Sequence, residues 1–314
     1  MTNARLAFVF PGQGSQQIGM LADAAGEFPE VRSTFSEASG VLGYDLWDLC
    51  QNGEQADINL TERTQPLLLT ASVALYRAWR ARGGARPAVM AGHSLGEWSA
   101  LVCAGVLSFT EAVSLVRERG RLMQEAVPAG EGAMAAVIGL DDAAVEAACS
   151  DAAQGEVVAA VNYNSPGQVV IAGSKAAVER AIDSCKAAGA KRAMPLPVSA
   201  PFHTELMRPA AEKLAPKIEQ TEFHVPEIPV VHNVHARREM DPAAIKALMV
   251  EQIYSPVRWT ACVQAMATDG VEQLVECGPG KVLAGLAKRI DRSLTAMNIE
   301  TPVQLSEAAL ATAE

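Results

Sequence analysis

The order of apolar runs in the first hundred residues predicts alternating strands and helices. Residues 6–10 form a continuous apolar run that ends at a Pro-Gly pair, which is typical of a strand buried on both faces. An apolar stripe with helical spacing lies within residues 68–79, and a second buried strand is expected at 88–91. The chain then turns into a helix that reaches about residue 104. This order predicts a parallel sheet with crossover helices.

After Pro128 the pattern changes to that of a smaller unit. It predicts strand, helix, strand, strand, helix and strand, at 133–140, 141–153, 157–163, 169–172, 175–188 and 192–198. This βαββαβ order is that of a ferredoxin-like domain. Beyond residue 199 the first alternation resumes, with strands expected at 229–234 and 273–277, helices at 205–218, 243–252 and after 280, and a frayed Ala-rich tail after 306. We therefore predict an α/β domain of residues 1–128 and 199–314, with residues 129–198 inserted as a small domain.

The composition is that of a globular protein, because 49% of the 314 residues are hydrophobic and 20% are charged. The 26 Lys and Arg residues are outnumbered by 36 Asp and Glu residues, and the net charge of −10 disfavours binding to nucleic acid. The first apolar run is too short for a signal peptide, and no stretch approaches the ~18 apolar residues of a spanning helix. Six scattered cysteines without a C-x-x-C pair predict neither disulfides nor a zinc site. We expect a soluble, cytoplasmic protein that does not bind membranes.

The segment Gly92-His93-Ser94-Leu95-Gly96 matches the G-x-S-x-G pattern of a nucleophile elbow. It lies between a predicted buried strand and a predicted helix, whose N-terminus offers free N–H groups to a developing oxyanion. The glycines permit the sharp turn that presents the serine. The alternative is an ordinary glycine-rich turn in which Ser94 caps the helix. The strand and helix on either side favour the nucleophile.

A serine nucleophile needs a base, and the chain has five histidines, at positions 93, 203, 224, 232 and 235. His203 ends a loop that returns from the small domain just before a predicted helix. Among the five histidines it is the first candidate for the base, by a modest margin. His93 lies inside the elbow and is expected to point away from Ser94. His232 and His235 are spaced like a metal pair, but no acid or cysteine cluster accompanies them. A loop without metal is therefore the favoured interpretation of that pair.

A glycine-rich loop follows the first strand directly. Glycines on both sides of Gln13 let its backbone approach a ligand closely, so its N–H is a candidate oxyanion donor. The alternative is a tight turn between a strand and a helix. The loop lacks the G-K-S/T sequence of a P-loop and the glycine spacing of a dinucleotide site. Gly278-Pro279-Gly280 is interpreted as the end of a strand.

Arg119 is the most informative single position. When residues 112–127 are placed on a helical wheel, Arg119 falls near the middle of the apolar face, which is formed by Ala112, Val113, Leu115, Val116, Leu122, Met123 and Ala126. A guanidinium directed into the interior needs a partner, and its flat fork suits a carboxylate held by two hydrogen bonds. The residues leave two alternatives open: a buried ion pair with an Asp or Glu, or a site for a substrate carboxylate.

Taken together, these segments resemble the malonyl-CoA:acyl carrier protein transacylases, and also the acyltransferase domains of polyketide synthases, which share the fold. The resemblance covers nearly the whole chain and rests on six motifs in the same order: Pro11 to Gln16, Gly92 to Glu97, Arg119-Gly120, Asn162 to Gln168, Phe202-His203 and Gly278 to Gly280. It implies an α/β-hydrolase-like large domain with a parallel sheet and an inserted ferredoxin-like domain. The active site would lie between the two.

The resemblance also implies a role for each candidate residue. Ser94 would be the nucleophile and His203 the base. The backbone N–H groups of Gln13 and Leu95 would form the oxyanion hole. Arg119 would bind the free carboxylate of a malonyl group.

The last implied residue is Gln252, whose carbonyl would orient the histidine in place of the acid of a hydrolase triad. The implied reaction moves malonyl from malonyl-CoA to the serine and then to the phosphopantetheine thiol of acyl carrier protein, without a metal or redox cofactor. Its product would supply fatty-acid synthesis or, alternatively, a polyketide synthase served in trans. A serine esterase or thioesterase is the less favoured enzyme, and an inactive binding scaffold would not need Ser94, His203 and Arg119 together. We expect a monomer.

Overall fold

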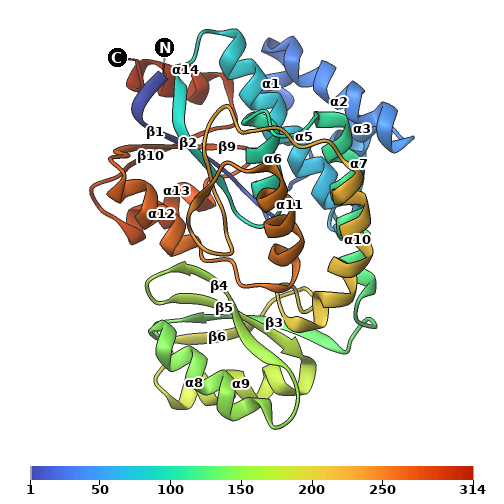
Figure 1. Ribbon diagram of the computed structural model, residues 1–314, viewed down its shortest axis with the longest axis vertical. Coiled ribbons are helices and arrows are strands. Elements are labelled where there is room, and N and C mark those ends of the chain that lie inside the picture. The colour runs from blue at the N-terminus through green and yellow to red at the C-terminus, as the bar shows by residue number, and fades with distance from the viewer. Residues whose placement is uncertain (1, 314) are drawn as a thin grey trace.

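The computed structural model describes residues 2–313, which contain two sheets of different kinds (Figure 1). Within these residues the larger sheet has six strands in the order β10-β9-β1-β2-β7-β8. They are β1 (Thr2–Phe10), β2 (Arg86–Gly92), β7 (Val230–Val231), β8 (Arg238–Glu239), β9 (Gln273–Cys277) and β10 (Thr295–Ile299). Neighbouring strands pair in parallel except β7 and β8. The predicted α/β class with a parallel sheet is confirmed.

Strand β1 is apolar on both faces because helices cover both faces of the sheet. Phe8 and Phe10 point to one side and Ala7 and Val9 to the other, all fully buried. The first side is covered by α2 (Pro29–Leu42), α5 (Thr61–Ala81), α6 (Leu95–Cys103), α7 (Phe109–Glu125), α10 (Arg208–Gln220) and α11 (Pro242–Glu251). The second side is covered by α12 (Trp259–Thr268) and α13 (Val282–Ile290). The sheet is therefore the middle layer of three (Figure 1).

The small sheet is antiparallel and has the strand order β4-β5-β3-β6. In chain order the unit is β3 (Gly132–Ile138), α8 (Asp142–Ala153), β4 (Val158–Ser165), β5 (Gln168–Ser174), α9 (Lys175–Ala187) and β6 (Arg192–Pro195). This is the expected βαββαβ order. Its two helices pack on the outer face of the sheet, at the end of the molecule opposite the chain termini (Figure 1).

The two sheets are connected through strand β4 of the small one. Val257 N donates to Val161 O at 2.7 Å, and Tyr163 N donates to Val257 O at 3.0 Å. Val257 lies two residues before the start of α12 of the large unit. The backbone on this side therefore ties the small sheet to the large unit near the carboxyl ends of the parallel strands.

The last twenty residues differ from the sequence-based expectation. The strand β10 was not predicted, and the segment expected to fray is part of helix α14 (Pro302–Ala311). Thr301 caps this helix: its side chain accepts from Gln304 N, while the Gln304 side chain accepts from Thr301 N. Asn3 Nδ2 donates to Thr312 O at 3.0 Å, so β1 holds the end of the chain in place. The expectation of a frayed tail was wrong, because a local capping box starts this helix and a tertiary contact with β1 holds its end.

The smaller helices complete the architecture: α1 (Ala22–Glu27), α3 (Leu46–Asn52), α4 (Gln55–Ile58) and the 3-10 turns η1 (Glu205–Met207) and η2 (Gln252–Tyr254). The strand expected at 229–234 is shorter, because only Val230 and Val231 pair with β2.

No helix within residues 2–313 has both the length and the apolar character that a bilayer crossing requires.

Candidate active site

Ser94 lies in the sharp turn between β2 and α6. Its backbone has φ 52° and ψ −108°, a region that non-glycine residues rarely adopt. A Cβ at Gly92 would overlap the backbone of Gly96, and a Cβ at Gly96 would overlap the carbonyl of Phe10. Only glycine fits at either position. The close packing around the two glycines holds Ser94 in the strained geometry of a nucleophile elbow.

His203 lies directly against the serine. Its Nε2 is 2.7 Å from Ser94 Oγ, and its Nδ1 is 2.9 Å from the backbone carbonyl oxygen of Gln252. Because a carbonyl can only accept, Nδ1 carries the proton and Nε2 is free to accept the serine hydroxyl. Burial, together with the positive charge of Arg119, lowers the pKa of His203 to about 3, although the hydrogen bond to Gln252 opposes the shift. The ring is therefore neutral at physiological pH, which is the protonation state of a general base.

The other histidines have different partners. His93 Nε2 is 2.8 Å from Asn164 Oδ1, so its ring is directed away from Ser94 as expected. His232 is buried and its Nδ1 is 2.5 Å from Glu97 Oε1. No group of three or more His, Cys, Asp or Glu side chains in the described part of the chain could hold a metal ion. Among the five histidines, the geometry brings only His203 to the serine.

Arg119 is buried in α7 with 1% of its surface exposed. Its Nη1 donates to Gln65 Oε1 at 2.8 Å, and its Nη2 donates to Gln252 Oε1 at 2.9 Å and to Ser94 Oγ at 3.2 Å. Its Nε has no partner among the described residues. Burial lowers the pKa of Arg119 to about 10, against an opposing effect of Glu97. No carboxylate within residues 2–313 forms a salt bridge with this guanidinium, which removes the ion-pair alternative.

Gln252 connects these groups through both its backbone and its side chain. Its backbone carbonyl accepts from His203, as expected of the carbonyl that orients the base. Its side-chain Nε2 donates to Ser94 O at 2.9 Å and to Glu97 Oε2 at 2.8 Å. This side-chain network was not predicted. A single residue thus contacts the base, the backbone of the elbow and the buried arginine.

The two expected oxyanion donors lie on either side of the nucleophile. Leu95 is the first residue of α6, and the loop of Gln13 follows β1. A Cβ at Gly12 would lie 2.6 Å from the carbonyl oxygen of His93, so a glycine is needed for the loop to approach the elbow this closely. The backbone N–H groups of Gln13 and Leu95 donate to no acceptor in the described part of the chain. Both are available to a ligand.

A cavity of about 530 Å³ opens onto Ser94 and the residues around it. Gln13, Ser94 and His203 line it from the large unit, and Met134 and Asn162 line it from the small sheet. The nucleophile is therefore accessible from a cleft between the two units, where the resemblance placed the active site.

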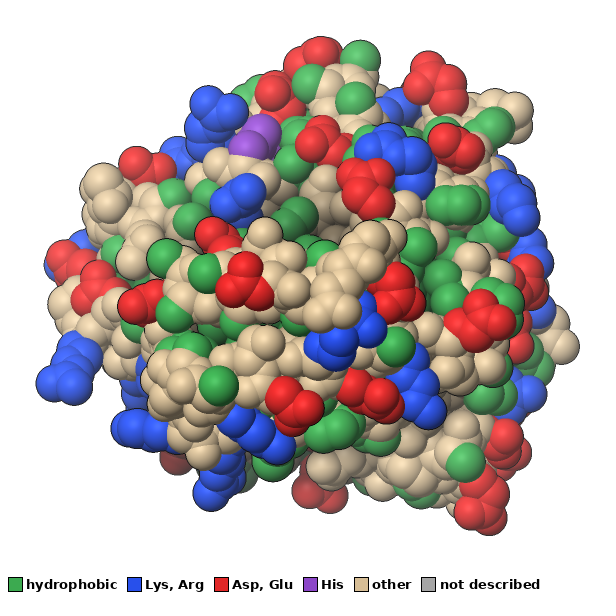
Figure 2. Space-filling view, turned by 90° about the horizontal axis from the view of Figure 1, so that it is seen from below, with side chains coloured by type: hydrophobic (Ala, Val, Ile, Leu, Met, Phe, Trp, Pro, Cys, Tyr) green, Lys and Arg blue, Asp and Glu red, His purple; other side chains and the backbone are tan. Residues whose placement is uncertain are grey.

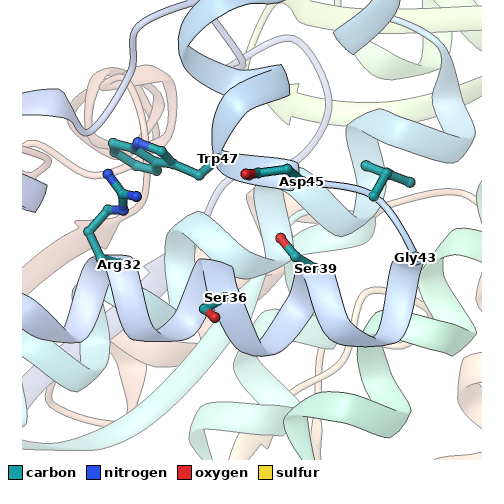
Figure 3. Close-up of a pocket in the computed structure, with 7 residues that line it drawn as sticks. Arg32, Ser36, Ser39, Gly43, Asp45 and Trp47 are labelled. Carbon is teal, nitrogen blue, oxygen red and sulfur yellow. The ribbon is translucent and has the colours of Figure 1, made fainter.

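A second hollow, of about 370 Å³, lies far from this cleft, between α2 and the start of α3 (Figure 3). The guanidinium of Arg32 lies 4.8 Å from the centre of the Trp47 ring at one side of it. The hollow has no serine or cysteine paired with a base. It is not a catalytic candidate.

Comparison with known proteins agrees with this geometry. The acyl transferase domain family matches residues 7–305. The malonyl CoA-acyl carrier protein transacylase of Escherichia coli K12 is 60% identical, over 97% of this chain and 98% of its own length. The enzyme of the same name from Bacillus subtilis is 45% identical, over 95% of this chain and 94% of its own. This chain belongs to the malonyl-CoA:acyl carrier protein transacylase family.

Solved structures of the transacylase family show the same fold. An acyl carrier protein S-malonyltransferase from Vibrio cholerae is 59% identical and superposes with a TM-score of 0.95, covering 96% of this chain and 99% of that one. A malonyl-transacylase solved in complex with its type II polyketide synthase acyl carrier protein is 57% identical, with a TM-score of 0.97, covering 98% and 99%. The chain is therefore an acyltransferase with the fold of this family.

Several polar residues of this transacylase site were not singled out from the sequence. Gln65 holds Arg119, and Asn233 accepts from Ser94 N at 2.9 Å while donating to Gly92 O at 2.7 Å. Glu97 was noted only as the last residue of the elbow motif. A signal was available for two of them, since Gln65 and Glu97 interrupt otherwise apolar helical faces. Their partners lie 54 to 155 residues away, so the contacts themselves were not visible.

Proposed function

We propose that this enzyme transfers the malonyl group of malonyl-CoA to the phosphopantetheine thiol of an acyl carrier protein, through a malonyl ester of Ser94. The observation that carries the proposal is the hydrogen bond between Ser94 and a neutral His203, formed beside a buried Arg119 that donates to the same serine oxygen. The names of the relatives and the complex of one relative with its carrier protein support both substrates.

In the first half-reaction, Ser94 Oγ attacks the thioester carbonyl while His203 Nε2 takes its proton. The C–S bond then breaks, His203 returns the proton to the sulfur, and CoA leaves as a thiol. The negative oxygen of the tetrahedral intermediate would accept hydrogen bonds from Gln13 N and Leu95 N. These are the two free N–H groups that flank the serine.

In the second half-reaction the carrier thiol takes the place of CoA. Its proton passes to His203 as the sulfur attacks the malonyl ester, and the proton then passes to the departing Ser94 oxygen. The chain itself supplies the nucleophile, the base and the oxyanion donors. We therefore propose that no metal or redox cofactor takes part, and that one chain suffices as a monomer.

Arg119 would pair with the free carboxylate of the malonyl group. Its Nε has no partner among the described residues, and its Nη2 donates at 3.2 Å to the Ser94 hydroxyl, a contact that the substrate carboxylate would replace to complete the two-bond fork. Pairing also affects the base, because the charge of Arg119 lowers the pKa of His203 in the free enzyme. A bound carboxylate offsets that charge and raises the basicity of His203 when the correct acyl group is present.

We propose fatty-acid synthesis as the pathway served. The solved complex of a relative with a polyketide carrier protein favours a second candidate, service to a polyketide synthase in trans. Hydrolysis is less favoured because the base is oriented by a carbonyl instead of an acid. All six cysteines are free, which supports the proposal of a reducing, cytoplasmic location.

The test is mass spectrometry of the intact protein after brief exposure to malonyl-CoA. Wild type should gain one malonyl group and Ser94→Ala none. Addition of holo acyl carrier protein should then move the label to the carrier. A label that persists in Ser94→Ala would overturn the nucleophile assignment, and loss of the label to water in the presence of carrier would favour the hydrolase.

A further inference from the structure

The site contains a buried carboxylate that the reaction does not use. Glu97 lies in the first turn of α6 and is fully buried. Its oxygens face three donors: His232 Nδ1 at 2.5 Å, Gln252 Nε2 at 2.8 Å and the backbone N–H of Asn233 at 3.3 Å. An ionised carboxylate is an acceptor only, so these surroundings match the charged form. His232 fits as the neutral ring, because an imidazolium would bury a second N–H at Nε2, which has no partner among the described residues.

One amide group separates this carboxylate from Arg119. The Oε1 of Gln252 accepts from Arg119 and its Nε2 donates to Glu97, so its dipole is aligned between cation and anion. The two hydrogen bonds of 2.9 and 2.8 Å and the width of one amide put Arg119 Nη2 within about 8 Å of Glu97 Oε2. No carboxylate among the described residues forms a salt bridge with the guanidinium itself.

We propose that Glu97 is a specificity-determining residue of this transferase: its buried negative charge is the counter-charge of Arg119 and limits how strongly the arginine prefers a carboxylate-bearing acyl group. The inference rests on the proposed function, because it assumes that Arg119 binds the malonyl carboxylate. Such a limit suits a transferase, since the enzyme must release malonyl to the carrier after binding it.

The sign of the effect follows from charge alone. Malonyl and acetyl thioesters share the same reacting carbonyl and thiol, and differ in one carboxylate. Their ratio of transfer rates therefore reports how the site treats that negative charge. Glu97 repels it and Arg119 attracts it, so removing the first charge raises the ratio and removing the second lowers it.

The decisive variant is Glu97→Gln, which keeps the shape and removes the charge. The ratio of kcat/KM for malonyl-CoA to that for acetyl-CoA should rise about tenfold or more, because Coulomb's law for charges roughly 10 Å apart at an effective dielectric constant of ~20 gives a factor of about fifteen. The new amide keeps an acceptor toward Gln252. Toward His232 it donates, which requires the ring proton to move from Nδ1 to Nε2.

Two control variants separate the possible causes. Arg119→Ala should lower the same ratio by at least about tenfold, which tests the carboxylate clamp of the proposed function independently. Glu276→Gln removes another fully buried carboxylate, in β9 and outside the site, and should leave the ratio unchanged. A general loss of packing would lower both rates in every variant without moving the ratio.

An unchanged or lower ratio in folded Glu97→Gln would overturn the role of Glu97 while leaving the clamp intact. An unchanged ratio in Arg119→Ala would instead overturn the clamp itself. Should Glu97→Gln fail to fold, the double variant with His232→Asn replaces the pair by two amides that bond to each other and removes the unpartnered Nε2. The same rise in the ratio is expected there, and its absence would count equally against the proposal.

Discussion

Three side chains from distant parts of the chain share one small network. Arg119 donates to the oxygen of Ser94, and Ser94 is hydrogen bonded to His203, which is 109 residues away in sequence. The arginine also lowers the pKa of the histidine. In the proposed mechanism, binding of the acyl group and activation of Ser94 are therefore linked, because a ligand that pairs with Arg119 changes the charge that acts on His203.

Replacement of His203 by Ala should slow formation of the acyl-enzyme by about 10²-fold or more, the usual scale of general-base loss. Quenched-flow labelling with malonyl-CoA would measure this rate. His235→Ala is the matched control, since His235 lies outside the hydrogen bonds of the site, and it should label at the rate of wild type. A larger loss in His235→Ala or His232→Ala than in His203→Ala would show that the base has been misassigned.

Single functional residues could be found from the sequence where the residues next to them in the chain form a distinctive pattern. Ser94 lies in a glycine pattern, and Arg119 interrupts an apolar face, so each could be found from local sequence. Gln65 also interrupts an apolar face, but neither its role nor that of His232 could be assigned from local sequence, because a buried polar side chain is explained only by its partner. Those partners are brought close by the packing of α5, α7 and the loop after β7.

At the scale of elements, the contact between α5 and α7 positions the arginine. Gly120 follows Arg119 and faces the first turn of α5, and Arg119 itself is bonded to Gln65 of that helix. A Cβ at Gly120 would lie 2.5 Å from the carbonyl oxygen of Thr61 and 2.9 Å from the Cα of Glu62. The absence of a side chain lets the two helices approach closely enough for the Arg119 bond to form.

Gly120→Ala should therefore destabilise the fold by about 1–3 kcal/mol, although alanine is the better helix former, because two helix backbones must move apart. Gly40→Ala is the matched change in α2, where an added Cβ meets nothing within 4 Å. It should stabilise by up to about 1 kcal/mol. Urea denaturation of both variants measures the two signs, and a stabilised Gly120→Ala would contradict the close packing assigned to that glycine.

Elements with a strong local pattern were predicted well, and those held by tertiary contacts were not. The strand β9 has the expected limits. Helix α7 begins after Ser108, as the Ser-x-x-Glu pattern of residues 108–111 indicates, and the Ser108 side chain accepts from Glu111 N at 3.3 Å. Strand β10 is half-exposed along most of its length, so it lacks the apolar run that marks the buried strands. Its existence depends on pairing with β9, which a local pattern does not contain.

At the scale of the whole molecule, the face formed by the small unit carries charges of both signs, and neither sign dominates it. Figure 2 shows basic and acidic side chains intermixed over this face. The net charge of −10 therefore does not arise from one acidic surface there. An acidic partner would need a local basic area on this chain, since the total charge repels it.

The stability of the whole molecule should depend on the ionisation of Glu276. This carboxyl is fully buried at the end of β9, where Oε2 accepts from Ala284 N at 2.8 Å and Oε1 has no partner among the described residues. Burial raises its pKa to about 7, against the opposing effect of the hydrogen bonds from Ala284 and Leu283. The folded state therefore prefers the protonated form more strongly than the unfolded chain does.

The pKa of Glu276 is higher in the folded state than in the unfolded chain. The protonated carboxyl therefore contributes its full stabilisation to the folded state below about pH 4.5, and this stabilisation is lost as pH rises through 7. The loss amounts to about 3 kcal/mol in the free energy of unfolding. Glu276→Gln keeps an acceptor for Ala284 N and cannot ionise, so its stability should exceed that of wild type increasingly from pH 5 to pH 8. Urea denaturation of both proteins across that range measures the difference. If the free energies of unfolding of the two proteins changed in parallel with pH, Glu276 would have the same proton affinity in the folded and unfolded states, and the raised pKa would be contradicted.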